Sequence, residues 1–231
     1  MTSIYERMLQ LPIFQGLSSE QLTGIVEKIP FSFVRFKPGA VIQQAGEPCD
    51  CVTFVLTGTV RMTTPTFGGR IRIVQDFAGP HTMPFYYLFG AETNYGSSLV
   101  AVDVVGVMQV RKKFFLTMLQ MNHIMLVNVM NILSTHAQKQ HLAMDLPCKD
   151  DVLMRLSSWM LAFTDRRATD IVFEADEEAW CQMMQTDPTV FWRNVTILES
   201  RKCIDTEGTM LRLVDRYTLR QLIRAIEQKE N

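Results

Sequence analysis

Hydrophobic and polar positions follow a short period over residues 31–110 and a longer one on either side. Runs such as FSFVRF, CVTFVL and IRIVQDF are short and apolar or alternating, and PG, AGEP, FGG and AGP separate them. Such runs between turn-forming residues are typical of antiparallel strands. In TFGGRIRIV, Gly68 and Gly69 can adopt the positive φ that a hairpin turn requires. The segment is therefore predicted to form an antiparallel β-barrel or sandwich.

Helices are predicted on both sides of this sheet. Before it, Gly16 marks a turn, and Ser18 followed by Gln21 has the spacing of a capping box at the start of a short helix. After it, residues 112–144 contain neither Gly nor Pro and are predicted to form one long helix. Pro147 ends that pattern, and DLPCKDD is interpreted as a hinge between domains.

Two apolar stripes run along the predicted long helix. One contains Met118, Met121, Met125, Val129 and Ile132, and the other contains Leu119, Leu126, Met130 and Leu133. One stripe can cover the sheet domain, so the second needs another partner. A two-stranded coiled-coil homodimer is the predicted partner, and the dimer contact is assigned to the first stripe. Burial of both stripes inside one larger core would explain the same pattern.

The last third of the chain has the order of a winged helix-turn-helix. DDVLMRLSSWMLAF predicts an amphipathic helix, and IVFEA predicts a short strand. A helix from about Asp176 to Gln185 follows, and a second helix begins with Asp187 as N-cap and Pro188 at its first position. CIDTEGTMLRLVD predicts a hairpin wing about Glu207-Gly208, and YTLRQLIRAIEQ predicts a closing helix.

Taken in sequence order, these parts resemble the Crp/Fnr family of bacterial transcription regulators. The resemblance covers essentially the whole chain, from LPIFQGLSSEQL and FKPGAVIQQAGEP through the sheet and long helix to TVFWRNVTILESRKCI. It implies an α+β fold with a cyclic-nucleotide-binding-like β-barrel of jelly-roll type at residues 1–111. A dimerisation helix at residues 112–146 and a winged helix that enters the DNA major groove at residues 147–231 would follow.

The effector cassette of this family departs from its pattern here. The family's Gly-Glu pair falls at Met83-Pro84, and its phosphate-binding arginine falls near Tyr95. Because a cyclic phosphate needs a fixed cation or a nest of N–H donors, cyclic AMP is not expected to bind. An unknown apolar or planar effector could use a pocket there, although a filled core would explain the same residues. The predicted pocket comprises Met83, Pro84, Tyr86, Tyr95, Ser97 and Ser98.

No resident cofactor or catalytic centre is predicted. The four histidines form no metal-ligand array, and His81 does not match the position of the family's haem ligand, so haem is not expected. The N-terminal cysteine cluster of the iron–sulfur members is absent. Neither paired carboxylates nor a nucleophile with its base occurs at useful spacing, which excludes the common classes of enzyme.

The predicted reading helix retains one residue of the family pattern. Where the family tends to have Ser-Arg-Glu-Thr-Val-Ser-Arg, this chain has DPTVFWR, which preserves Arg193. Phe191, Val195 and Leu198 are spaced to face inward, which turns the neighbouring side chains outward. Arg193 could make a bidentate contact to guanine. The predicted DNA-binding residues are Thr189, Trp192, Arg193, Thr196, Arg201 and Lys202.

Charge complicates this prediction. Residues 147–231 hold 12 Lys and Arg against 15 Asp and Glu, a net of −3, whereas residues 1–146 have a net of +2. DNA affinity depends mainly on neutralising phosphates, so an acidic domain must gather its cations on one face. The acids crowd at Asp176, Glu177 and Glu178, away from the predicted reading residues.

Two functions from different classes are compatible with these patterns. The first is a homodimeric cytoplasmic regulator with duplex DNA, a second copy and, as a candidate, RNA polymerase as partners. The second is a dimeric sensor or protein-interaction module whose degenerate winged helix no longer reads DNA and whose Trp192 contacts a protein. No apolar run approaches the roughly 20 residues of a membrane span, so no membrane partner is expected.

Overall fold

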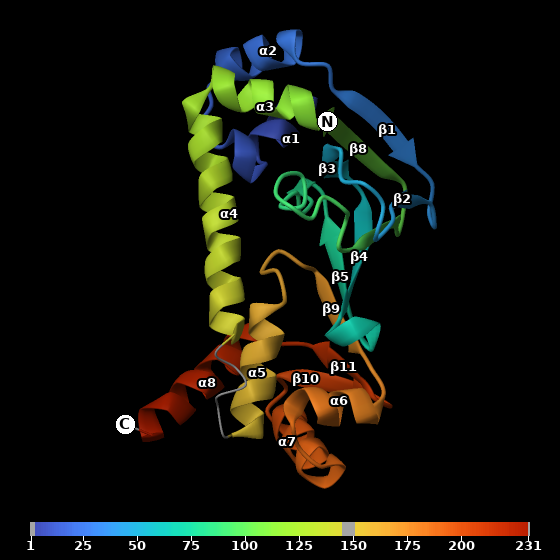
Figure 1. The fold of residues 1–231 in the computed structure, drawn as a ribbon, viewed down its shortest axis with the longest axis vertical. Helices are drawn as coiled ribbons and strands as arrows, with labels where there is room; N and C mark the ends of the chain where they lie inside the picture. The colour runs from blue at the N-terminus through green and yellow to red at the C-terminus, as the bar shows by residue number, and fades with distance from the viewer. Residues whose placement is uncertain (1–2, 145–150, 231) are drawn as a thin grey trace. The chain divides into compact units, whose positions relative to one another are not determined.

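The computed structural model describes residues 3–144 and 151–230 (Figure 1). The chain divides into two compact units, one of residues up to Met62 with Phe77–His136, and the other of Thr63–Asp76 with the residues from Ala137 onward. The three-part division expected from the sequence stays a prediction. Its boundary at residues 146 and 147, and all of the proposed hinge except Asp151, lie outside the described residues.

Two antiparallel sheets form the core of the first unit. One has the strand order β1-β8-β3-β6, and the other contains β4-β7-β2. The strands are β1 (Ser32–Phe36), β2 (Val41–Gln43), β3 (Cys51–Thr57), β4 (Thr59–Thr66), β6 (His81–Thr82), β7 (Ser98–Ala101) and β8 (Val105–Arg111). The predicted α+β class is confirmed, with a β-sandwich that is not closed into a barrel.

Short helices at the N-terminus pack against this sandwich. They are α1 (Ile4–Leu9), a 3₁₀ turn η1 (Pro12–Phe14) and α2 (Ser19–Lys28). The predicted capping box is confirmed, because the Gln21 N–H donates to Ser18 Oγ at 3.1 Å and the Ser18 N–H donates to Gln21 Oε1 at 2.9 Å. Leu11, Ile13 and Phe14 are fully buried and join the core of the sandwich.

The prediction of one continuous helix over residues 112–144 is wrong, because the helix is broken at Asn122. The segment forms α3 (Lys112–Met121) and α4 (His123–Met144), with an angle of 118° between them. Asn122 has extended backbone angles, and its Oδ1 accepts the N–H of Ile124 at 2.9 Å, which caps the start of α4. An asparagine side chain can thus end one helix and begin another without Gly or Pro.

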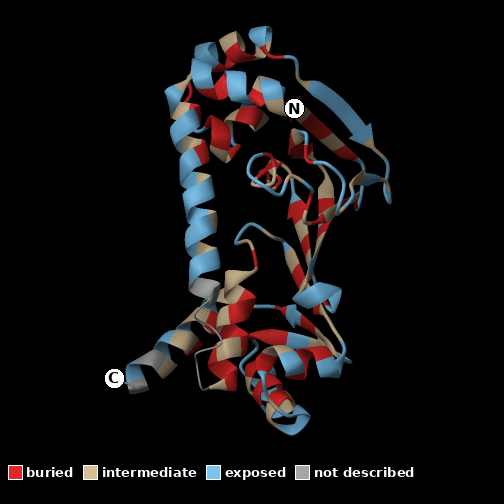
Figure 2. Ribbon diagram, in the orientation of Figure 1, coloured by how far each residue is buried: buried red, intermediate tan, exposed pale blue. Residues whose placement is uncertain are grey.

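The apolar stripe assigned to the dimer contact is largely buried. Met118, Met125 and Val129 are buried, and Ile132 packs against the same core, so the stripe predicted to form the dimer contact lies inside its own unit. The physical reason is that both α3 and α4 turn this side toward the N-terminal helices and β-sandwich. The exposed large apolar residues of α4 are instead Leu126, Val127, Met130 and Leu133, at 41%, 49%, 57% and 36% exposure. Figure 2 shows much of α4 as exposed.

No single helix among the described residues is long and apolar enough to cross a membrane. The bent pair of α3 with α4 up to His141 meets a test of length and composition alone.

The second unit is a winged helix with a four-stranded sheet. Its strand order is β10-β11-β9-β5, with every neighbouring pair antiparallel. The elements are α5 (Val152–Ala162), β9 (Asp170–Glu174), α6 (Glu177–Met184), α7 (Pro188–Ser200), β10 (Ile204–Glu207), β11 (Met210–Leu213) and α8 (Arg216–Glu230), with β5 (Ile71–Ala78). Trp180, Phe173 and Phe191 are fully buried in its core.

The fourth strand of this sheet comes from the β4–β5 hairpin. Gly68 and Gly69 have φ of 66° and 85°, as the turn predicted from TFGGRIRIV requires. β5 then lies beside β9 in a register that runs from Arg72 opposite Glu174 to Asp76 opposite Asp170. Ile71 and Ile73 are buried among the apolar residues of the winged helix. The hairpin tip is therefore an integral part of the second unit.

We expect Asn122→Ala to lower the free energy of unfolding by about 1 kcal/mol, because the substitution removes an N-cap from α4. Thermal unfolding followed by circular dichroism measures the effect. Asn131→Ala, on the exposed side of α4, is the matched control and should not destabilise the protein. Equal melting temperatures for Asn122→Ala and wild type would contradict the capping role.

Candidate DNA-reading interface

The candidate reading helix is α7, and local sequence chemistry determines where it begins. The Val190 N–H donates to Asp187 Oδ1 at 3.0 Å, and Pro188 occupies the first turn, where its missing N–H costs no hydrogen bond. Phe191 and Leu198 are fully buried. The predicted inward face of α7 therefore packs into the core of the second unit.

Three of the predicted reading residues on α7 are exposed. Thr189, Arg193 and Thr196 point away from the core, and Arg193 makes no ion pair with the residues that the structure describes. The Thr196 hydroxyl donates to the Trp192 carbonyl at 2.9 Å, so it is partly occupied within the helix. Of the three, Arg193 is the group most able to donate to a base edge.

Trp192 is held by its own domain. Its side chain is half-buried, its ring packs edge-on against Phe191 at 5.1 Å, and its indole Nε1–H donates to Glu177 Oε2 at 2.5 Å. This bond ties α7 to the start of α6. Trp192 therefore supports the pair of helices more than it presents a free aromatic surface.

Further cations follow the reading helix. Arg201 and Lys202 are exposed in the turn between α7 and β10, where Lys202 adopts a φ of 56°. Arg212 on β11 differs from them, because its guanidinium donates to both carboxylate oxygens of Asp170 at 2.7 Å. Arg212 is thus paired with an acid, so the described part of the chain has fewer free cations near α7 than the sequence suggests.

The turn between α6 and α7 contains Gln185, where the sequence comparison with the Crp/Fnr pattern expects glycine. Gln185 adopts left-handed angles of φ 48° and ψ 53°. Its N–H donates to the carbonyls of the last turn of α6. The geometry of the turn is therefore kept at a modest conformational cost.

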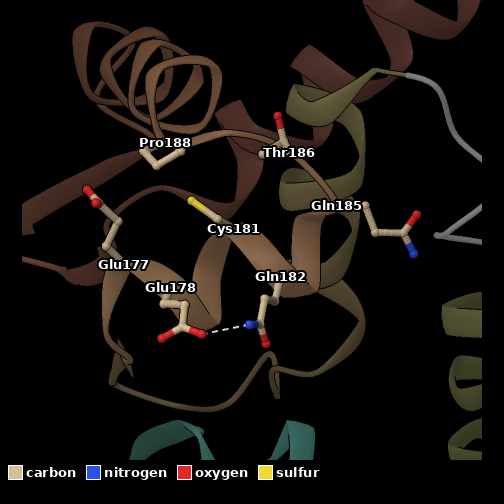
Figure 3. Close-up of a pocket in the computed structure, with 7 residues that line it drawn as sticks. All are labelled: Glu177, Glu178, Cys181, Gln182, Gln185, Thr186 and Pro188. Carbon is tan, nitrogen blue, oxygen red and sulfur yellow. Dashed lines mark hydrogen bonds between the residues drawn. The ribbon is translucent and has the colours of Figure 1, made fainter.

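The N-terminus of α6 has an acidic rim. Asp176 caps the helix by accepting the Ala179 N–H, and Glu177 and Glu178 lie in its first turn, where the helix dipole favours negative charge. Glu177, Glu178 and Gln182 line one side of an open hollow of about 520 Å³, and Pro188 at the start of α7 lines the other (Figure 3). Carboxylates in this position would repel a nearby phosphate.

Arg70, at the tip of the β4–β5 hairpin, offsets part of this acidity. One of its guanidinium nitrogens lies 3.5 Å from both Asp176 and Glu178, and another donates to Gln182 Oε1. Charge alone did not reveal this pairing, because 106 positions separate Arg70 from Asp176. The signal that could have found it is the cation placed directly after the turn glycines.

Most of the predicted effector residues contact other residues of the chain. Met83 is buried, and its N–H donates to the Thr53 carbonyl at 3.0 Å. Tyr95 is buried, and its hydroxyl lies 3.4 Å from the sulfur of Cys51. Burial raises the pKa of Tyr95, of Cys51 and, to about 11, of Cys49, so all three groups are neutral near pH 7.

The two serines of the predicted pocket serve the β2–β7 region. Ser98 Oγ accepts the Ala45 N–H at 3.0 Å, and the buried Ser97 accepts a bond from the Gln43 side chain through its carbonyl. These contacts bring Ser97 and Ser98 beside strand β2 and leave Pro84 and Tyr86 in the preceding loop. The structure therefore does not gather all six predicted residues around a shared set of polar contacts.

Tyrosines of the same loop fill neighbouring space. A side chain at Gly96 would collide with the Tyr87 hydroxyl and ring. Tyr86 stacks on His136 of α4, with ring centroids 3.7 Å apart and planes 9° from parallel. Sequence reasoning missed His136, since it belongs to no motif. Within the described residues, no group of three or more His, Cys, Asp or Glu is placed to hold a metal ion.

Comparisons with known proteins agree with this architecture. The family described as the cyclic nucleotide-binding domain matches residues 33–122. The catabolite activator protein of Thermus thermophilus is similar in structure, with a TM-score of 0.53 at 15% identity, over 93% of this chain and 99% of that one. The sensor domain of the transcriptional regulator DNR of Pseudomonas aeruginosa has a TM-score of 0.50 at 21% identity, over 58% of this chain and 89% of that domain.

No curated protein matches the chain in a sequence comparison. The family match and the shared fold nevertheless agree with the order of sandwich, helices and winged helix described above. Residues 33–122 thus match the cyclic nucleotide-binding domain family, within a chain that shares the fold of the Thermus thermophilus catabolite activator protein.

Proposed function

We propose that this protein is a homodimeric transcription regulator that reads duplex DNA through α7. The observation that carries the proposal is the placement of Arg193, exposed on a helix whose opposite face is fully buried. Arg201 and Lys202 are exposed directly after the same helix and can contact phosphates on either side of the groove. Thr189 and Thr196 are secondary candidates for contact with bases or the backbone.

The net negative charge of the last third of the chain is compatible with this function. Arg70 comes from outside residues 147–231, so it adds a cation to the winged helix that the charge count of that segment omits. Its contacts with Asp176 and Glu178 reduce the repulsion that those carboxylates would exert on phosphate. The cations that remain beside α7 can then act on DNA.

We propose that dimerisation uses the exposed stripe of α4, which consists of Leu126, Met130 and Leu133. Their positions i, i+4 and i+7 place them in one stripe of the helix, beside the stripe that contains the buried Met125 and Val129. A second copy that packs the same stripe against this one would bury both, as in a symmetric helix pair.

A regulator of this kind would not respond to cyclic AMP. The positions of the family's glutamate and arginine hold Pro84 and Tyr95, and the Tyr95 hydroxyl is directed at Cys51. Tyr87 fills the space beside Gly96. Any effector would instead be apolar or planar, and it would act by favouring one dimer geometry over another. We place this regulator in the cytoplasm, with RNA polymerase as a further proposed partner and no catalytic activity.

One observation favours a second function, in which the winged helix binds a protein. The hollow beside α6 is lined by Glu177 and Glu178, which suit a basic partner better than DNA. Trp192 would not provide the contact, because its indole is bonded to Glu177. The two functions differ in how binding to DNA depends on salt.

We expect the protein to bind random duplex DNA with a steep dependence on salt. Three free cations in each of two protomers would give a slope of about −5 in log K against log salt. Arg193→Ala should weaken binding to a preferred sequence by about 1–3 kcal/mol and relax the base preference. Fluorescence anisotropy measures both, with Arg35→Ala on β1 as the control. Absence of binding at low salt would support the protein-binding alternative.

We expect Met130→Glu to weaken the dimer by about 100-fold, because symmetry places the new carboxylate twice in an apolar contact. Sedimentation equilibrium across a concentration series measures the dissociation constant. Asn131→Glu introduces the same charge on the adjacent exposed position and should have little effect. A monomeric wild type, or equal effects of both substitutions, would contradict this interface.

We expect Arg70→Gln to lower DNA affinity by up to about fivefold at low salt, because Asp176 and Glu178 lose their partner. The loss should shrink as salt rises, since screening acts on exposed charges. Arg72→Gln is the matched control: it removes the same charge from the same hairpin, where Arg72 pairs with Glu174 at 2.6 Å. Equal losses for the two variants would show that only net charge matters.

A further inference from the structure

A cluster of cations lies at the C-terminal end of α5. Arg216, Arg220 and Arg224 recur every four residues on α8, so successive side chains project from the same side of the helix. Arg166 belongs to the turn that follows α5, and Lys139 belongs to α4. All five residues lie in the second unit. We refer to these five residues as the arginine cluster.

Arg216 has a structural role within the cluster. Its guanidinium donates to the carbonyls of Leu161 and Thr164 at 3.3 Å and to the hydroxyl of Thr164, which are groups at the end of α5. A cation at this end also complements the helix dipole. Arg216 alone can cap this end of α5, so the capping of α5 does not explain the other four cations of the cluster. The Nε–H of Arg216 is buried without a partner among the described residues.

The other four cations of the cluster form no ion pair within the described ranges. They are Arg166, Arg220, Arg224 and Lys139. Burial lowers the pKa of Lys139, and Arg166, Arg216 and Arg220 lower it further, while Asp165 opposes them. Burial and the neighbouring Arg220 likewise lower the pKa of Arg216 to about 10. Like charges held together in partly buried positions destabilise the fold unless an anion binds among them.

The arginine cluster is separate from the candidate DNA-reading interface. Arg155, near the start of α5, donates to the Met184 carbonyl at 2.7 Å and so marks the end of α5 that meets the helix-turn-helix. Arg216 marks the opposite end. The helix-turn-helix that carries Arg193 therefore meets the opposite end of α5 from the arginine cluster. The cations of the cluster come from three chain segments, and two of these segments carry half-buried cations. Such an arrangement suits a compact anion better than the extended backbone of a nucleic acid.

We propose that the arginine cluster binds a small molecule that carries more than one phosphate group. Guanidinium groups donate paired hydrogen bonds to phosphate oxygens, and several of them can share one polyphosphate chain. Arg220, Arg224 and Arg166 would hold the ligand directly, while Arg216 keeps the end of α5 in place. The binding site does not depend on whether α7 reads DNA.

Calorimetric titration of the full chain with inorganic pyrophosphate and tripolyphosphate tests this proposal. We expect both to bind at low salt, tripolyphosphate more tightly, and Arg220→Gln with Arg224→Gln to weaken both by at least about tenfold. Arg35→Gln with Lys37→Gln, which removes two exposed cations from the other unit, is the matched control and should bind like wild type. Far-UV circular dichroism of each variant verifies the fold.

Three results would overturn the proposal. The first is failure of both probes to bind wild type, and the second is an equal loss of binding in the two double variants. The third is that Arg220→Gln with Arg224→Gln loses affinity for duplex DNA while pyrophosphate does not compete with DNA for the wild type, since the cluster would then bind a nucleic-acid backbone. None of these results affects the proposed role of Arg193, because Arg193→Ala measures that role on its own.

Discussion

The pairing of β5 with β9 is the interaction on which the winged-helix unit depends. Without β5, the wing sheet would end at β9 with an open row of backbone donors and acceptors. The hairpin supplies the missing strand and buries Ile71 and Ile73 in the core that holds α5, α6 and α7. It also delivers Arg70 to the start of α6. A strand that precedes its partner β9 by about a hundred residues thus completes both the sheet and the charge balance of the unit.

Charge is distributed unevenly around this unit, and the distribution suggests a separate use for each end of α5. Acids gather at the start of α6, where the helix dipole and Arg70 stabilise them. Free cations remain along α7 and in the turn after it, and a second group surrounds the end of α8 that meets α5. The first cationic group accounts for the proposed contact with DNA, and the second for the proposed phosphate site.

Local chemistry made much of the fold predictable. The capping box at Ser18, the cap at Asp187 and the turn glycines at Gly68 and Gly69 act over a few residues, and the structure has all of them as expected. The inward face of α7 was likewise readable from its spacing, because Phe191 and Leu198 belong to one helical stripe.

Long-range features were not predictable in the same way. The break at Asn122 depends on one side-chain cap that competes with a strong helical pattern, and it determines which stripe of α4 is buried. The partner of Arg70 and the stack of Tyr86 on His136 join segments whose sequences carry no shared motif. In the predicted effector pocket, the residue types indicated an apolar environment, but packing determined that Tyr87 would occupy space beside Gly96.

In the proposed regulator, two copies present Arg193 to successive turns of one duplex. Selection of bound sequences from a random duplex pool, followed by hydroxyl-radical footprinting, measures this arrangement. We expect a two-fold symmetric site whose half-sites lie about 34 Å apart, or one helical turn. A single unpaired half-site, or a pool that shows no enrichment, would contradict it.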